Sequence, residues 1–111
     1  MTNKALVIQD SQNQVFDIDA FMAVRNLTAE YCHTCTDALH AIKSTRYRCV
    51  VVSIDMQREN PVEIIRALRN FENETGLSPI PILVAGKTRP LTQSEIGRLN
   101  ISAQIHSHNL K

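Results

Sequence analysis

Short apolar runs, each bounded by polar residues, recur along the chain and predict the strands of a sheet. Three of these runs are almost wholly apolar, at residues 5–8, 49–54 and 80–85. Runs of this length suit central strands that are covered on both faces, as in a parallel sheet. Residues 27–32 alternate more in character, and residues 103–106 form a short final run. The pattern therefore predicts five strands.

The segments between these strands have helical spacing and recognisable helix starts. The clearest start is Asn60 as N-cap, with Pro61 at the first helical position and Glu63 in the first turn. Gly76 is expected to end this helix. The other expected start signals are the pair Ser11 and Gln14, the single residue Thr36, and the pair Thr92 and Glu95. Strand and helix thus alternate four times, and the pattern ends on a strand.

This alternation, with short loops, predicts an α/β fold in which helices cover both faces of a parallel sheet as a three-layer sandwich. Residues 1–111 are expected to form one domain, because a chain of this length supports about one hydrophobic core. Functional residues of such folds gather in the loops at the carboxyl ends of the strands. Candidate functional residues are therefore expected in the loops at the carboxyl ends of the strands.

Composition and charge exclude several classes of protein. Lys and Arg number 12 against 11 Asp and Glu, a net charge of +1, so nucleic-acid binding by this domain is not expected. Arg46, Arg48, Arg66 and Arg69 form no basic cluster in the sequence, and solubility is their expected role. The apolar runs are too short to cross a bilayer or to act as a secretory signal. Three cysteines, an odd number, favour reduced thiols and a cytoplasmic location.

Residues 5–11, 47–56, 61–69 and 80–86 together resemble the receiver domain of bacterial response regulators, the signalling proteins of two-component systems. The resemblance covers nearly the whole chain and implies the flavodoxin-like strand order 2-1-3-4-5. Receivers usually end with a fifth helix, whereas here little sequence follows the last predicted strand. The fifth helix is therefore expected to be missing or truncated, unless the chain is an excerpt of a longer protein. One flank of the sheet would then be open to a second copy or a partner helix.

The resemblance also implies where phosphorylation chemistry would lie. In the family, an aspartate after the third strand accepts a phosphoryl group, and carboxylates hold the Mg²⁺ that neutralises its oxygens. The matching positions are Gln9 and Asp10 at the acidic pair, Ser53 at the phosphoacceptor, Gly86 at the switch hydroxyl and His108 at the phosphate-pairing lysine. Only Asp10 keeps the family's residue type. A serine without a neighbouring base is a weak nucleophile, so the chain resembles a degenerate pseudo-receiver.

The sequence therefore favours a phosphorylation-independent module that acts by protein–protein interaction in bacterial signal transduction or regulation. No enzymatic activity, no cofactor, no metal and no membrane association are expected. The predicted contact surface is the fourth helix and fifth strand, at residues 91–100 and 103–108. Its partner would be a signalling protein or a second copy of the chain, giving a homodimer.

Two alternatives stay open at this point. Asp55 lies two residues beyond Ser53, so in an extended strand both side chains would share one side. With Asp10 it would form a small acidic site that holds Mg²⁺, or it would act as an atypical phosphoacceptor. Cys32 and Cys35 form a Cys-x-x-Cys motif between a strand and a helix, the position of a thioredoxin-like redox pair. Zinc binding by these cysteines would need distant ligands, because a second cysteine pair is lacking.

Overall fold

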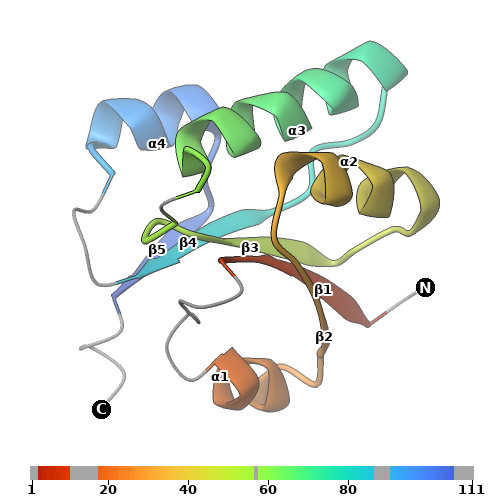
Figure 1. The fold of residues 1–111 in the computed structure, drawn as a ribbon, viewed down its shortest axis with the longest axis vertical. Helices are drawn as coiled ribbons and strands as arrows, with labels where there is room; N and C mark the ends of the chain where they lie inside the picture. Colours follow the sequence, from red (N-terminus) through yellow and green to blue (C-terminus); the bar gives the residue numbers. More distant parts are fainter. Residues whose placement is uncertain (1–2, 11–17, 57, 87–90, 107–111) are drawn as a thin grey trace.

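Five strands alternate with four helices in the part of the chain that the computed structural model describes, residues 3–10, 18–56, 58–86 and 91–106 (Figure 1). The strands are β1 (Lys4–Ile8), β2 (Thr28–Cys32), β3 (Cys49–Ser53), β4 (Ile82–Gly86) and β5 (Ala103–His106). The helices are α1 (Ile18–Val24), α2 (Cys35–Ser44), α3 (Pro61–Thr75) and α4 (Gln93–Leu99). All five predicted strands are present.

The strands form one parallel sheet in the order β2-β1-β3-β4-β5, which confirms the predicted topology. Its centre is built from the three most apolar strands, with Val7 of β1 level with Val51 of β3, and Val51 level with Leu83 of β4. Every residue of β3 is buried, as expected for a strand that is covered on both faces. None of the described helices is long and apolar enough to cross a membrane.

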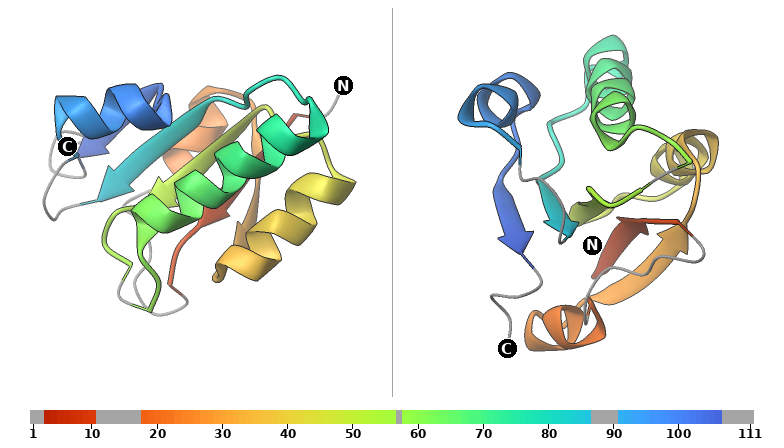
Figure 2. Two further views of the ribbon diagram at one scale, coloured as in Figure 1. Left: turned by 90° about the horizontal axis from the view of Figure 1, so that it is seen from above. Right: turned by 60° about the vertical axis from the view of Figure 1, so that its left-hand side comes forward.

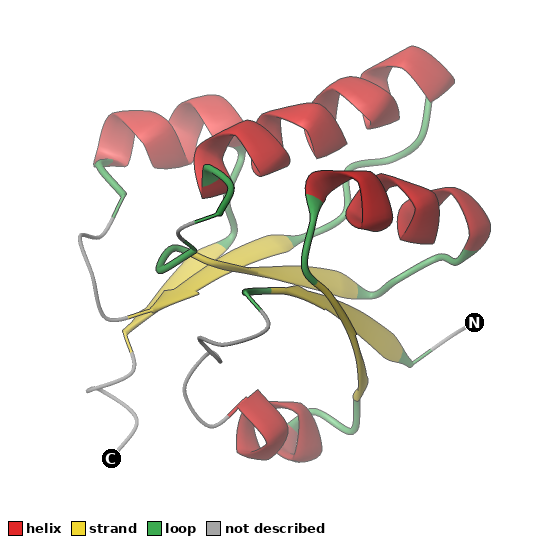
Figure 3. Ribbon diagram, in the orientation of Figure 1, coloured by secondary structure: helices red, strands yellow, loops and turns green. Residues whose placement is uncertain are grey.

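The helices cover the two faces of the sheet unequally. α2, α3 and α4 lie on one face, and α1 is the only described helix on the other (Figures 2 and 3). The larger core cluster includes Ile65 and Leu68 of α3, while the smaller one packs Val7 and Val51 against Met22 of α1. The three predicted layers are therefore confirmed. No fifth helix occurs among the described residues, and the segment after His106 lies outside them.

Three of the predicted helix signals act as expected. Asn60 caps α3 by accepting a hydrogen bond from Val62 N, and Gly76 ends that helix in the left-handed conformation with φ of 72°. Thr92 and Glu95 form the predicted capping box at α4. The pair Ser11 and Gln14 lies outside the described residues.

The prediction of Thr36 as the cap of α2 is wrong, because the cap is Thr34, whose side chain accepts from Asp37 N at 3.0 Å. α2 begins at Cys35, and the N–H of that first residue donates to the carboxylate of Glu59, which is 24 residues further along the chain. A distant side chain thus satisfies a donor that a helix leaves open at its start. Cys35 directly precedes Thr36, the residue that was predicted as the cap.

The predicted role of Arg69 in solubility is wrong, because Arg69 joins α3 to α4. Its Nη1 donates to Glu72 Oε1 at 2.8 Å and to Ile80 O at 2.9 Å. Its Nε and Nη2 donate to the carbonyls of Leu99 and Asn100 at 3.0 and 2.7 Å, where α4 ends. Such contacts satisfy carbonyls that a helix leaves open at its last turn.

Glu72 completes this network from the buried side. Its side chain is 4% exposed, and its Oε2 accepts from Ile80 N at 2.6 Å. Ile80 is therefore held by a side chain, and β4 begins at Ile82, two residues later than the apolar run predicted. Pro81 contributes to this late start because proline has no N–H for the ladder.

Candidate functional site

The residues that match the receiver's phosphorylation site meet at the carboxyl ends of β1, β3 and β4. Gln9 and Asp10 follow β1 and are only 5% and 4% exposed. Ser53 is the last residue of β3 and pairs with Ala85, next to Gly86 at the end of β4. The structure therefore brings four of the five predicted positions to one edge of the sheet. The fifth, His108, lies outside the described residues.

Ser53 is placed as a structural residue of the turn that follows β3. It is 1% exposed, and its Oγ accepts a hydrogen bond from Asp55 N at 3.1 Å. The Ser53 hydroxyl is thus engaged in this turn, and an alcohol without a neighbouring base is a weak nucleophile. That Ser53 does not serve as a phosphoacceptor stays a prediction.

Asp55 lies in a turn and not on the strand, since β3 ends at Ser53. The strand alternation that would align Asp55 with Ser53 therefore does not extend to it. Its carboxylate instead occupies space next to Gly86, where φ is 157°. A Cβ on Gly86 would lie 2.7 Å from Asp55 Oδ2 and 2.6 Å from Ile54 Cγ1. Gly86 thus lacks the switch hydroxyl and also leaves the room that the Ile54–Asp55 turn fills.

The described side chains do not fit the Mg²⁺ site that the receiver resemblance implies. Among them, no three His, Cys, Asp or Glu residues lie together in a group that could hold a metal ion. Asp10 is the one carboxylate at the matched positions, with Gln9 and Ser53 where the resemblance implies two more. Mg²⁺ sites in proteins depend on carboxylates, so this donor set is a poor one. The role of Asp55 as an atypical phosphoacceptor stays a prediction.

Cys32 and Cys35 lie next to this edge of the sheet, and both are free thiols. Cys32 ends β2, where its carbonyl accepts from Gln9 N at 3.1 Å, and Cys35 begins α2. Between them, His33 Nδ1 lies 2.7 Å from Gln9 O. The Cys-x-x-Cys segment therefore supports the end of β1.

The surroundings of the two thiols oppose the chemistry of a redox pair. Burial, followed by the charge of Asp37, raises the pKa of Cys32 to about 12. Burial and the charge of Glu59 raise the pKa of Cys35. The Glu59 carboxylate also accepts from Cys35 N at 3.0 and 3.1 Å, so an anion already occupies the helix start that would stabilise a thiolate. No sequence motif links Glu59 to this segment.

Neither thiol of the pair should therefore react quickly near neutral pH. Labelling with iodoacetamide across a pH series, resolved by residue with peptide mass spectrometry, should place the pKa of both thiols above the usual value of about 8.5. Glu59→Gln should lower the pKa of Cys35 by removing a nearby negative charge. The control Glu74→Gln, on the exposed end of α3, should not. A wild-type thiol that titrates below pH about 7 would restore the redox alternative.

The comparisons with known proteins agree on the fold. No protein-family model matches the chain, and no curated protein matches it. Among solved structures, it is similar to a CheY-like receiver domain from Methylobacillus flagellatus, with a TM-score of 0.71 and 18% identity over 100% of this chain and 94% of that one. A receiver protein from Pseudomonas putida gives a TM-score of 0.70 and 16% identity over 97% and 88%.

A third similar structure is the response regulator TrrA from Thermotoga maritima, solved in complex with Mg²⁺ and BeF. It has a TM-score of 0.68 and 15% identity, over 96% of this chain and 86% of that one. At such identities the likeness concerns the fold alone. The fold is thus that of response-regulator receiver domains, in agreement with the flavodoxin-like order of the sheet.

Proposed function

We propose that the protein is a phosphorylation-independent pseudo-receiver that acts by protein–protein interaction in two-component signalling or a related regulatory system. Its receiver fold supports the signalling context. The single observation that carries the proposal is the state of the phosphoacceptor position. Ser53 is a buried alcohol that accepts a hydrogen bond from the following turn. A receiver built this way has the family's shape without its reacting carboxylate.

Contacts within the chain hold both ends of α4, which belongs to the predicted contact surface of α4 and β5. At the start of α4, Leu91 N donates to Gln104 Oε1 at 2.6 Å, and Gln104 Nε2 donates back to Leu91 O at 3.2 Å. At its end, Arg69 holds the carbonyls of Leu99 and Asn100. A surface fixed at both ends is pre-organised for binding, which lowers the cost of association. This arrangement supports a constitutive contact.

A substitution on α4 tests this surface. Arg98 is exposed on α4, and Arg98→Glu should reduce capture of the partner from a lysate of the source cells several-fold by reversing one surface charge. Arg66→Glu is the matched control, because Arg66 is an exposed arginine of α3. Partner recovery should be equal with and without acetyl phosphate and Mg²⁺. Binding that is unchanged in Arg98→Glu would contradict the proposed face, and binding that needs acetyl phosphate would contradict the proposed independence. Sedimentation of the purified chain would show whether the partner is a second copy of the chain.

A further inference from the structure

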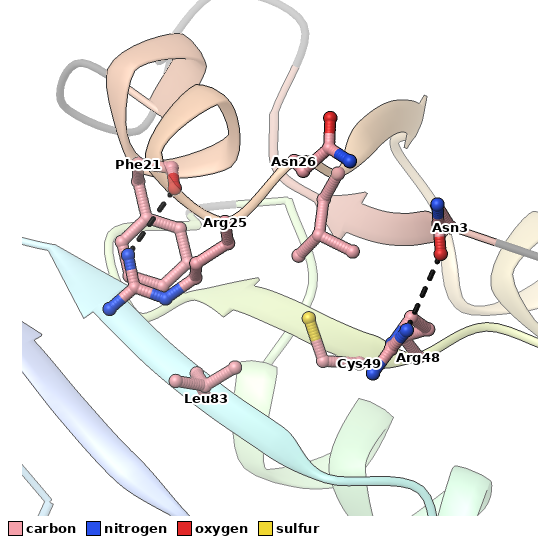
Figure 4. A pocket seen from close by; sticks show the side chains of 8 residues that line it. Asn3, Phe21, Arg25, Asn26, Arg48, Cys49 and Leu83 are labelled. Atoms are coloured by element: carbon pink, nitrogen blue, oxygen red, sulfur yellow. Dashed lines mark hydrogen bonds between the residues drawn. The ribbon is translucent and has the colours of Figure 1, made fainter.

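A hollow of about 490 Å³ lies on the face of the sheet that carries α1 (Figure 4). Its apolar lining comes from Phe21 of α1, Leu27 before β2, Cys49 of β3 and Leu83 of β4. The opposite face has three helices, whereas α1, with seven residues, is the only described helix here. An apolar sheet face is stable when another element packs on it. The hollow is therefore a part of this face still open to such an element.

Arg25 and Arg48 line the hollow beside its apolar floor, the side chains of Phe21, Leu27, Cys49 and Leu83, and give it a positive charge. The guanidinium carbon of Arg25 lies 3.7 Å from the centroid of the Phe21 ring, and its Nη1 donates to Phe21 O at 3.3 Å. Arg48 Nη1 donates to Asn3 Oδ1 at 3.3 Å. Both guanidinium groups are close enough to lower the pKa of the Cys49 thiol against the larger effect of its burial. Each arginine is thus oriented by a contact and keeps further N–H donors.

No carboxylate balances this charge among the described residues that line the hollow, which besides the arginines are apolar side chains and two asparagines. Planar guanidinium groups with free donors are suited to bind carboxylates in a bidentate manner. The charge of the hollow is therefore complementary to an acidic ligand with an apolar body.

The strands beneath the hollow determine the shape of that ligand. Cys49 and Leu83 lie on β3 and β4, and both strands are paired on each side within the sheet. Their backbone groups are already used in the ladder, so an added strand would find no partners there. A helix satisfies its own backbone and offers only side chains, which is what this surface can bind.

We propose that the hollow receives an amphipathic helix of a protein partner, with its apolar residues on the floor formed by Phe21, Leu27, Cys49 and Leu83 and its flanking carboxylates on Arg25 and Arg48. The contact lies on the face opposite α4, so it does not depend on the surface proposed above. A module with both contacts would bring two proteins together.

Two synthetic helical peptides of about 18 residues test this site, a length at which a helix forms measurably. Both carry leucines at positions i, i+3, i+4 and i+7, and their flanking residues are glutamate in one and lysine in the other. By fluorescence anisotropy, the glutamate peptide should bind about tenfold more tightly, and the Arg25→Glu/Arg48→Glu variant should reverse this preference. The control Lys43→Glu/Arg66→Glu, with both residues exposed on α2 and α3 of the other face, should leave the preference unchanged. Circular dichroism establishes that each variant is folded.

The thiols report where the peptide binds. The bound glutamate peptide should slow labelling of Cys49 by iodoacetamide and leave the rate at Cys35, across the sheet, unchanged. Equal affinity for both peptides, a preference that survives the double charge reversal, or no binding of either peptide at about 1 mM would overturn the proposal. Binding with no protection of Cys49 would overturn it as well, because the helix would then lie elsewhere.

Discussion

Replacing Glu72 with alanine should lower the free energy of unfolding by about 3–5 kcal/mol, the effect of removing one partner from a buried ion pair. The side chains of Glu72 and Arg69 are 4% and 14% exposed, so water cannot replace the lost contacts. The change removes the acceptor of Ile80 N and the partner of the Arg69 guanidinium together. Arg69 then holds the end of α4 while carrying an uncompensated charge.

Urea denaturation followed by circular dichroism measures this loss. Glu63→Ala is a matched control, because Glu63 pairs with Arg66 on the same helix at the same spacing but in an exposed position. It should cost at most about 1 kcal/mol. Glu72→Gln, which keeps an acceptor for Ile80 N, should fall between the two. Equal losses in Glu72→Ala and Glu63→Ala would show that the buried network does not stabilise the fold as described.

Adding a side chain at Gly86 should destabilise the protein by about 1–3 kcal/mol, the usual cost of overpacking. The smallest change, Gly86→Ala, places a Cβ 2.6 Å from Ile54 Cγ1 and 2.7 Å from Asp55 Oδ2. The side chains of Ile54 and Asp55 must therefore move. Gly86→Thr, which supplies the hydroxyl of an ordinary receiver, should cost at least as much.

Thermal unfolding of Gly86→Ala and Gly97→Ala makes the comparison, since a Cβ on Gly97 meets nothing within 4 Å. Gly97 lies within α4, where alanine is favoured over glycine by about 1 kcal/mol, so this control should gain stability. A Gly86→Ala variant as stable as wild type would mean that the turn is not packed against Gly86.

Much of the fold could be predicted because its signals are local. Apolar runs near residues 5–8 and 49–54 specify buried strands, and Asn60 with Pro61 specifies a helix start within a few residues. The start of α2 was predicted two residues late, because Thr34 and Thr36 are both threonines near the start of the helix and Thr34 is the cap. Glu59, a residue from a later loop, also satisfies the N–H of Cys35 there, and no local pattern shows this contact.

The candidate site was predictable in its positions and less so in its geometry. Gln9, Asp10, Ser53 and Gly86 follow strand ends, and in a parallel sheet such ends meet at one edge. The placement of Asp55 depends on where β3 ends and on the absence of a side chain at Gly86, which involves two strands at once.

The contacts of Arg69 are long-range in the same way. Its partners Leu99 and Asn100 are 30 and 31 residues further along the chain and are main-chain carbonyls, which carry no sequence signal. Long-range contacts to the backbone are thus the part of this structure that local patterns do not specify.

The central claim is that this receiver fold works without phosphorylation, and titration with Mg²⁺ and beryllofluoride tests it most directly. Amide ¹H–¹⁵N NMR spectra of the wild-type chain should show no change at saturating reagent, neither at Ser53, Asp55 and Gly86 nor along α4. TrrA from Thermotoga maritima, solved in complex with Mg²⁺ and BeF, is the positive control. Saturable shifts at Asp55 and Gly86 that disappear in Asp55→Asn would contradict the account and establish an atypical phosphoacceptor.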